Sequence, residues 1–157
     1  MTLHDGNGWV EDHSGRRHWG RFGAAGLLVV DRRRPGAPVV LLQHRAAWTA
    51  DGGTWGIPGG ARDSHEDAVA AALREAHEET GLPAEAVHVA GDPLVDDRGG
   101  WSYTTVLGEL VADVTLVVES ESEALGWVAV DEVDQRLLHP GFARTWPVLR
   151  ARLGQTG

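Results

Sequence analysis

The chain has 157 residues, of which 42% are hydrophobic, which suits one folded domain and argues against intrinsic disorder. A net charge of −9 argues against polymeric nucleic acid as a partner, and the absence of cysteine excludes disulfides and thiolate metal sites. No apolar run reaches the length of a membrane span and the first residues do not resemble a signal peptide, so we expect a cytoplasmic protein without membrane contact.

The first part of the chain predicts a hairpin followed by two strands. Residues 8–20 alternate around Ser14-Gly15, as in a hairpin. Residues 24–31 are an apolar run typical of a buried strand, and residues 38–44 predict a second strand. The only basic cluster, Arg32 to Arg34, lies between them before Pro35-Gly36, and we interpret it as a solvated turn rather than a phosphate-binding patch.

The clearest predicted helix covers residues 65–80. It contains no Gly or Pro and is rich in Ala, Glu, Leu and Arg. Ser64 is the expected N-cap, with Asp67 completing a capping box. Gly81 then supplies the left-handed residue that ends a helix. Just before this helix, residues 54–58 should be extended, because Ile57 precedes a proline.

The rest of the chain predicts further strands and a last helix, as follows: strands at 87–95 and 101–111 around a Gly99-Gly100 turn, a strand or strand extension at 114–118, a short strand at 125–130, and a helix at 142–153. Trp146, Leu149 and Leu153 lie near one face of that helix. The mixture predicts an α/β or α+β class with a mixed sheet, in a single domain over residues 1–157 with residues 1–20 as a hairpin extension.

Three carboxylates crowd one side of the helix at 65–80. At about 100° per residue, Glu75, Glu78 and Glu79 fall within about a third of its circumference, and like charges at this spacing destabilise a bare helix. They form either a solvated acidic face offset by Arg74 or a site for a hard cation such as Mg²⁺. The adjacent face, which we expect to pack on the sheet, holds Val69, Ala72, Leu73, Ala76 and Thr80.

The segment before the helix favours the cation site. Gly59-Gly60 joins the extended segment to the helix, and glycine lets backbone approach a ligand closely. The pattern from Gly60 through Glu66 to residues 74–82, Arg-Glu-Ala-His-Glu-Glu-Thr-Gly-Leu, resembles the Nudix box of the Nudix hydrolase superfamily, MutT-like members included. Every fixed position of the box at 60–82 matches. The one departure is Ala76 in place of a bulky aliphatic residue, which affects packing rather than chemistry.

The resemblance implies a fold in which a mixed β-sheet is sandwiched between α-helices. It also implies an enzyme that cleaves a nucleoside diphosphate linked to another group and that depends on Mg²⁺, with Mn²⁺ as an alternative cation. It implies these roles: Glu78 and Glu79 as metal ligands, Glu75 as ligand or general base, the Gly59 carbonyl in the metal shell, Arg74 orienting the glutamates, and Glu66 supporting them. Glu121 and Glu123 lie in an acidic loop that either reaches the metal or is a solvated turn.

Substrate contacts are predicted more loosely. Arg45 either grips a phosphate or forms a surface ion pair. A nucleobase needs a flat amphipathic partner, for which Trp48, Trp101, Tyr103 and Phe142 are candidates, although any one of them is more often a core residue. His139 is a candidate because it precedes the last helix, where family members often contact the base.

Several functions remain open. Nucleoside triphosphates are slightly favoured as substrates, and ADP-ribose or dinucleotides are the alternative. Enzymes of that second group often dimerise through N-terminal strands, and the hairpin at 8–20 could do this or cover a sheet edge, so both monomer and homodimer are compatible. A non-catalytic nucleotide sensor would lack one of Glu75, Glu78 and Glu79, yet all three are present. An RNA-binding module would need a basic groove.

Overall fold

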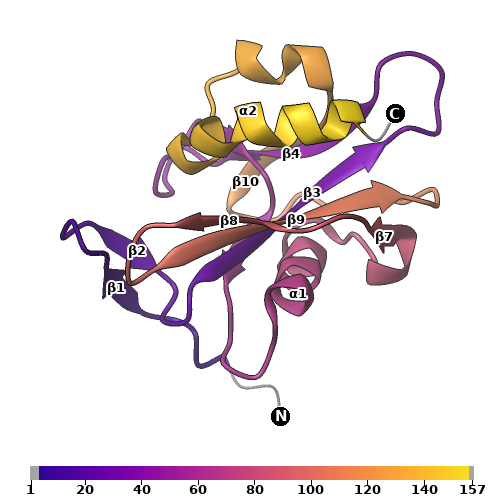
Figure 1. The fold of residues 1–157 in the computed structure, drawn as a ribbon. Helices are drawn as coiled ribbons and strands as arrows, with labels where there is room; N and C mark the ends of the chain where they lie inside the picture. Colours follow the sequence, from indigo (N-terminus) through magenta and orange to yellow (C-terminus); the bar gives the residue numbers. More distant parts are fainter. Residues whose placement is uncertain (1–3, 156–157) are drawn as a thin grey trace.

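A mixed sheet lies between two helices in the computed structural model, which describes residues 4–155 (Figure 1). The strand order is β10-β4-β3-β9-β7, and β3 and β9 pair in parallel while all other pairs are antiparallel. The main strands are β3 (Ala24–Asp31), β4 (Val39–Arg45), β7 (Val87–Val89), β9 (Ser102–Leu110) and β10 (Ser122–Ala129). Shorter strands add to their edges: β5 (Trp55–Gly56) to β4, β6 (Gly59–Ala61) to β3, and β8 (Leu94–Asp97) to β9.

Each face of the sheet is covered by one helix (Figure 1). Helix α1 (Ala68–Thr80) packs on one face through small side chains, and α2 (Pro140–Gln155) packs on the other through Phe142, Trp146 and Leu149. Two short 3₁₀ helices, η1 (Ala84–Ala86) and η2 (Val130–Gln135), connect these layers to the strands. The predicted mixed fold is confirmed. No helix in the described residues is long and apolar enough to cross a membrane.

The strands near the N-terminus agree with the sequence. β1 (Trp9–Glu11) and β2 (Arg17–Trp19) form the predicted hairpin, and β3 covers the predicted residues. The arginine cluster is a turn between β3 and β4, as predicted. Arg33 there binds Asp31 and Asp113, and these ion pairs account for its charge.

Three predictions for the later strands were wrong in detail. The segment 87–95 divides into β7 and β8, and β10 begins three residues earlier than expected. Residues 114–118 form no strand, because this segment leaves the sheet and closes against the end of α1. There the backbone N–H of Val117 donates to the carbonyl of Thr80 at 2.8 Å.

The start of α1 also differs from the prediction. Asp67, not Ser64, is the N-cap, and its side chain accepts a hydrogen bond from the Ala70 N–H. Ser64 is occupied elsewhere, because its backbone N–H and hydroxyl both donate to Asp5. The predicted end is confirmed: Gly81 is left-handed, with a φ of 76°.

The orientation of α1 about its own axis determines which of its side chains reach the site. Ala72, Ala76 and Thr80 are buried, as predicted for the sheet-facing side. Ala71, which is not among the residues predicted for that side, is also fully buried. The buried face is therefore turned towards the carboxylates, which brings Glu75 and Glu79 to the edge of the core.

Candidate active site

The three helix carboxylates line one cavity. Glu75, Glu78 and Glu79 face the loop that precedes β10, across a cavity of about 270 Å³. The opposite wall is formed by Gln43 of β4 and residues 119–122. Glu121 is in this wall, so the structure brings it to the same cavity as the helix glutamates. Glu123 is exposed on β10 and is not among the residues that line the cavity.

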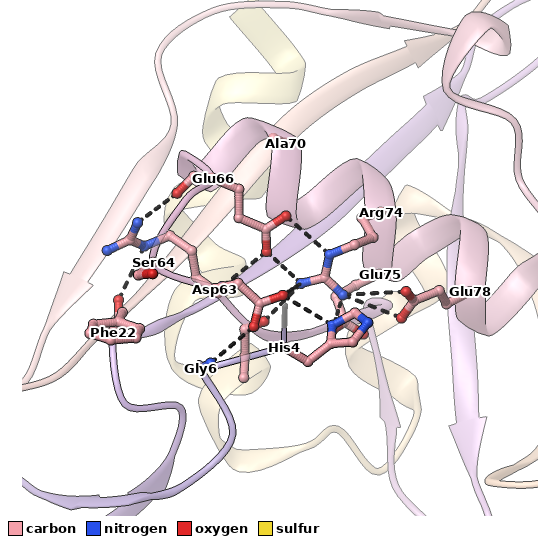
Figure 2. A network of polar contacts seen from close by, with 12 residues as sticks. His4, Gly6, Phe22, Asp63, Ser64, Glu66, Ala70, Arg74, Glu75 and Glu78 are labelled. Atoms are coloured by element: carbon pink, nitrogen blue, oxygen red, sulfur yellow. Dashed lines mark hydrogen bonds and ion pairs between the residues drawn. The ribbon is translucent and has the colours of Figure 1, made fainter. Parts of the chain in front are cut away.

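Arg74 is the hub that holds the carboxylates together (Figure 2). Its guanidinium donates to Glu66 through Nε at 3.0 Å and Nη2 at 2.5 Å. Nη1 donates to Glu75 Oε1 at 2.9 Å and lies 3.3 Å from Glu78 Oε2. Nη2 also reaches the Ala61 carbonyl at 3.0 Å. One planar cation therefore fixes two of the three cavity glutamates and ties them to Glu66, which supports the role expected for that residue.

The glycine pair of β6 fits against the same glutamates. The Gly59 N–H donates to Glu79 Oε2 at 3.2 Å. A β-carbon on Gly60 would stand 2.6 Å from the carboxyl carbon of Glu75, closer than real contacts allow. The backbone at Gly60 can approach the Glu75 carboxylate this closely only because this residue lacks a side chain.

Burial, with the charge of neighbouring carboxylates, raises carboxyl pKa values at the cavity. Burial, followed by the charge of Glu75, raises the pKa of Glu79 to about 8. Burial also raises the pKa of Glu75, although Arg74 opposes this shift. Neighbouring glutamate charges add to the shift at both residues. Clustered oxygen donors with excess negative charge fit a hard divalent cation, and Glu75, Glu78, Glu79 and Glu121 are placed to hold one.

Tyr103 lies beside this cluster, on β9. Its hydroxyl fits into space left by Gly26 and Gly59, because a β-carbon at either glycine would collide with it. Burial, followed by the charge of Glu79, raises the pKa of the phenol, so the hydroxyl stays protonated. The structure thus places a neutral donor next to the carboxylates.

Three other candidates gather at one end of the sheet. Arg45 donates from Nε to the Ala50 carbonyl at 2.9 Å, and its charge lowers the pKa of Glu79, which places it near the cavity. His139 Nε2 lies 3.2 Å from Asp51, while burial and then the charge of Arg45 depress the pKa of the imidazole. Trp48, in the loop between β4 and β5, is 70% exposed. A basic group, an imidazole and an open aromatic ring therefore share this region.

The comparison with known proteins decides the family. The NUDIX domain family model matches residues 20–151. The chain is a member of the Nudix family. It is a Nudix hydrolase, an enzyme that acts on phosphoric anhydride bonds.

Two curated Nudix relatives cover almost all of this chain. A Mycobacterium tuberculosis protein provisionally named 8-oxo-dGTP diphosphatase 3 is 51% identical over 152 residues, covering 93% of this chain and 70% of the relative. A Bifidobacterium longum nucleoside triphosphate pyrophosphatase/Nudix hydrolase fusion protein is 41% identical over 155 residues, covering 96% of this chain. The chain spans only 32% of that fusion protein.

Solved structures give the same family. The Nudix hydrolase RenU of M. smegmatis is similar with a TM-score of 0.91 and 46% identity, covering 97% of this chain and 98% of RenU. A C. elegans Ap4A hydrolase shares the fold with a TM-score of 0.68 and 21% identity, covering 84% of this chain and 98% of that one.

Two predicted substrate residues of this Nudix domain lie elsewhere. Phe142 is only 4% exposed and packs against Trp146 in the α2 core, so its ring is not open to a nucleobase. Trp101 stacks on His18 of the hairpin, with ring centroids 4.1 Å apart and planes within 7°. Both rings are packed against other rings of the protein, which is a common environment for aromatic side chains.

Sequence reasoning missed Asp63, which lies in the loop before the Nudix helix. Asp63, His65 and Glu66 offer ligand atoms within 4.8 Å of one another, a spacing that could hold a cation. However, Glu66 is bound by Arg74, and Asp63 accepts from Gly6 and pairs with His4. These oxygens are satisfied by protein groups, so we assign the cluster to support of Arg74. The N-terminal partners of Asp63 are distant in sequence and give no local signal.

Proposed function

We propose that this Nudix hydrolase is a divalent cation-dependent pyrophosphohydrolase of nucleoside triphosphates, oxidised guanine nucleotides among them. The observation that carries the proposal is that Glu75, Glu78 and Glu79 line one cavity, with Arg74 bound to Glu75 and Glu78. Burial, followed by the charge of Glu75, raises the pKa of Glu79 to about 8. The name of the 51% identical relative supports triphosphates as the substrate class.

The cation site is built from oxygen donors. Glu78 and Glu79, with Glu75, the Gly59 carbonyl and Glu121, would hold Mg²⁺, and Mn²⁺ suits the same donors. A cation bound there neutralises charge on the diphosphate and lowers the pKa of water, which is most of what substitution at phosphorus requires.

Glu75 is the residue we propose as general base. Arg74 binds its Oε1 at 2.9 Å, which leaves Oε2 to take a proton from the attacking water. Burial raises the pKa of this carboxyl, and a base with a pKa nearer neutrality accepts a proton more readily. Glu121 is the alternative base, because it faces the same cavity from the opposite wall.

The remaining contacts orient the nucleotide. Arg45 would bind a phosphate, and Tyr103 would donate its proton to a phosphate oxygen beside Glu79. Trp48 would stack on the base, since its ring is exposed, while His139 would contact the base edge.

A second candidate substrate class is ADP-ribose or a dinucleotide. Glu121, the acidic residue placed after the Nudix box and at the cavity, favours this class, because such enzymes often use further glutamates there. A non-catalytic sensor is disfavoured, because every box glutamate is present and lines one cavity or supports it.

The test is product release with Mg²⁺ across nucleoside triphosphates, oxidised nucleotides, ADP-ribose, dinucleotides and sugar nucleotides, with the Glu78→Gln protein as control. We expect pyrophosphate and a nucleoside monophosphate from one triphosphate, and loss of turnover in the variant by about 100-fold or more. AMP from ADP-ribose instead would support the second class. Tight nucleotide binding without turnover, in folded protein that binds Mg²⁺, would contradict the enzymatic proposal.

A further inference from the structure

The N-terminal segment of this chain is anchored to the loop that begins the Nudix helix. Asp63 is 1% exposed, and both of its carboxylate oxygens are used by this segment. Oδ1 accepts from the Gly6 N–H at 3.0 Å, and Oδ2 lies 3.1 Å from His4 Nδ1. Next to these contacts, Asp5 accepts from the Ser64 N–H at 2.8 Å. Residues 4–6 therefore satisfy a buried carboxylate that otherwise has few partners.

The same carboxylate touches the hub of the active site. Asp63 Oδ2 lies 3.5 Å from Arg74 Nη2, and the Asp63 N–H donates to Glu66 Oε1 at 3.0 Å. Glu66 is the residue that Arg74 grips most closely. Figure 2 shows contacts running from Asp63 to Gly6, to His4 and to Arg74. A continuous chain of contacts thus leads from the N-terminal segment to Glu75 and Glu78.

The docking is specific to glycine at position 6. A β-carbon there would collide with the carbonyl oxygen of Arg62, a backbone atom that cannot easily move aside. On its other side, the Gly6 carbonyl accepts from the Arg21 N–H at 2.7 Å. The backbone at Gly6 therefore contacts the backbone of both Arg62 and Arg21, and only a residue without a side chain fits there.

We infer that residues 4–6, docked on Asp63, are a positioning element that keeps Arg74 aligned for cation binding by Glu75 and Glu78. A buried carboxylate must be paired, and it competes for whatever cation is nearest. While Gly6 and His4 satisfy Asp63, Arg74 stays at a long 3.5 Å from it and directs Nη1 to the glutamates. When the segment is undocked, Asp63 draws the guanidinium towards itself and away from Glu75 and Glu78.

The test measures Mn²⁺ and Mg²⁺ binding to the full chain by titration calorimetry. The variants are Gly6→Ala, which blocks docking without touching Arg74, and Gly6→Ala combined with Asp63→Asn, which also removes the charge that would draw the guanidinium away. The control is Gly154→Ala near the end of α2, where an added methyl group meets nothing. Circular dichroism checks folding, and the milder pair His4→Ala with Asp5→Ala serves if Gly6→Ala does not fold.

Removing outer partners of metal ligands weakens binding by about 10- to 100-fold, and we expect about tenfold here because Asp63 acts through Arg74. The affinity should fall in Gly6→Ala, should recover in Gly6→Ala combined with Asp63→Asn, and should not change in Gly154→Ala. At saturating cation, kcat should fall while the KM for nucleotide stays constant.

The inference rests on the proposed cation site, and the experiment separates the two. No divalent binding by the unaltered chain would remove the proposed function itself. Normal binding by the unaltered chain, with equal affinity in folded Gly6→Ala protein, would overturn the inference alone and leave Asp63 a purely structural residue.

Discussion

Gly60 and Glu75 are in such close contact that the helix carboxylate occupies the place of the missing glycine side chain. A β-carbon on Gly60 would lie 2.6 Å from the carboxyl carbon and 2.7 Å from Oε2 of Glu75. Position 60 thus requires glycine because of the neighbouring carboxylate and not because of its backbone conformation, since the φ of Gly60 is not in the region that favours glycine.

Gly60→Ala is therefore predicted to displace Glu75 rather than to strain the backbone. We expect kcat to fall by about 100-fold, as when a positioned catalytic group moves by an ångström, with little change in Tm. Steady-state kinetics and thermal unfolding measure the two effects. Unchanged kcat would show that the Glu75 side chain moves aside without cost.

The raised pKa of Glu79 predicts the pH dependence of metal-free stability. In the folded chain the pKa of this carboxyl is about 8, whereas in the unfolded chain it has the ordinary glutamate pKa of 4.5. Between these values the folded state binds more protons, so the free energy of unfolding decreases as the pH rises. In EDTA, Tm should fall from pH 5 to pH 8, and this slope should be smaller in Glu79→Gln. The same slope in both proteins would argue against the raised pKa.

Arg74 is predicted to be irreplaceable by lysine. Its fork serves Glu66, Glu75 and the Ala61 carbonyl at once, while an ammonium group offers one point charge. Arg74→Ala should cost about 3 kcal/mol of unfolding free energy, because it leaves nearly buried carboxylates unpaired. Arg74→Lys should recover part of that stability but little activity. Urea unfolding beside kinetics tests this, and full activity in the lysine variant would contradict it.

Substitutions at Trp48 and Phe142 are predicted to have different effects, the first on substrate binding and the second on stability. Trp48→Ala should leave Tm unchanged and raise the KM for nucleotide about tenfold, the expected loss for one stacked base. Phe142→Ala should cost about 3–5 kcal/mol of stability because it empties a core position, while KM stays the same in the folded protein. Urea unfolding and initial-rate kinetics on both variants test this, and the reverse pattern would show that the two assignments are exchanged.

The sequence predicted the fold where local signals and packing agree. The alternating hairpin, the apolar run of β3 and the glycine stop of α1 all appear in the structure as expected. The errors lie where distant contacts decide. Ser64 is a good cap by type, yet Asp5, fifty-nine residues away, takes its hydroxyl and leaves the cap to Asp67.

The candidate site also contains residues that local sequence signals predict and residues that they do not. Glu75, Glu78 and Glu79 are set by helical spacing, so their neighbourhood follows from the sequence. The exposure of the aromatic rings cannot be predicted from the sequence in this way, because it depends on tertiary packing. Trp48 is exposed, while Trp101 is stacked on His18. Asp63 gave no signal, because its role arises only from the return of the N-terminal segment.

The sharing of one guanidinium among Glu66, Glu75 and Glu78 also bears on how such enzymes diverge. A change at any of these residues disturbs the others through Arg74, so single substitutions in this part of the molecule are costly to fitness. Within residues 4–155, the side chains of Arg45 and His139 bind the loop that carries Trp48 and not Arg74. New substrates are thus most accessible to evolution through these peripheral segments, while the hydrolytic machinery is inherited as one unit.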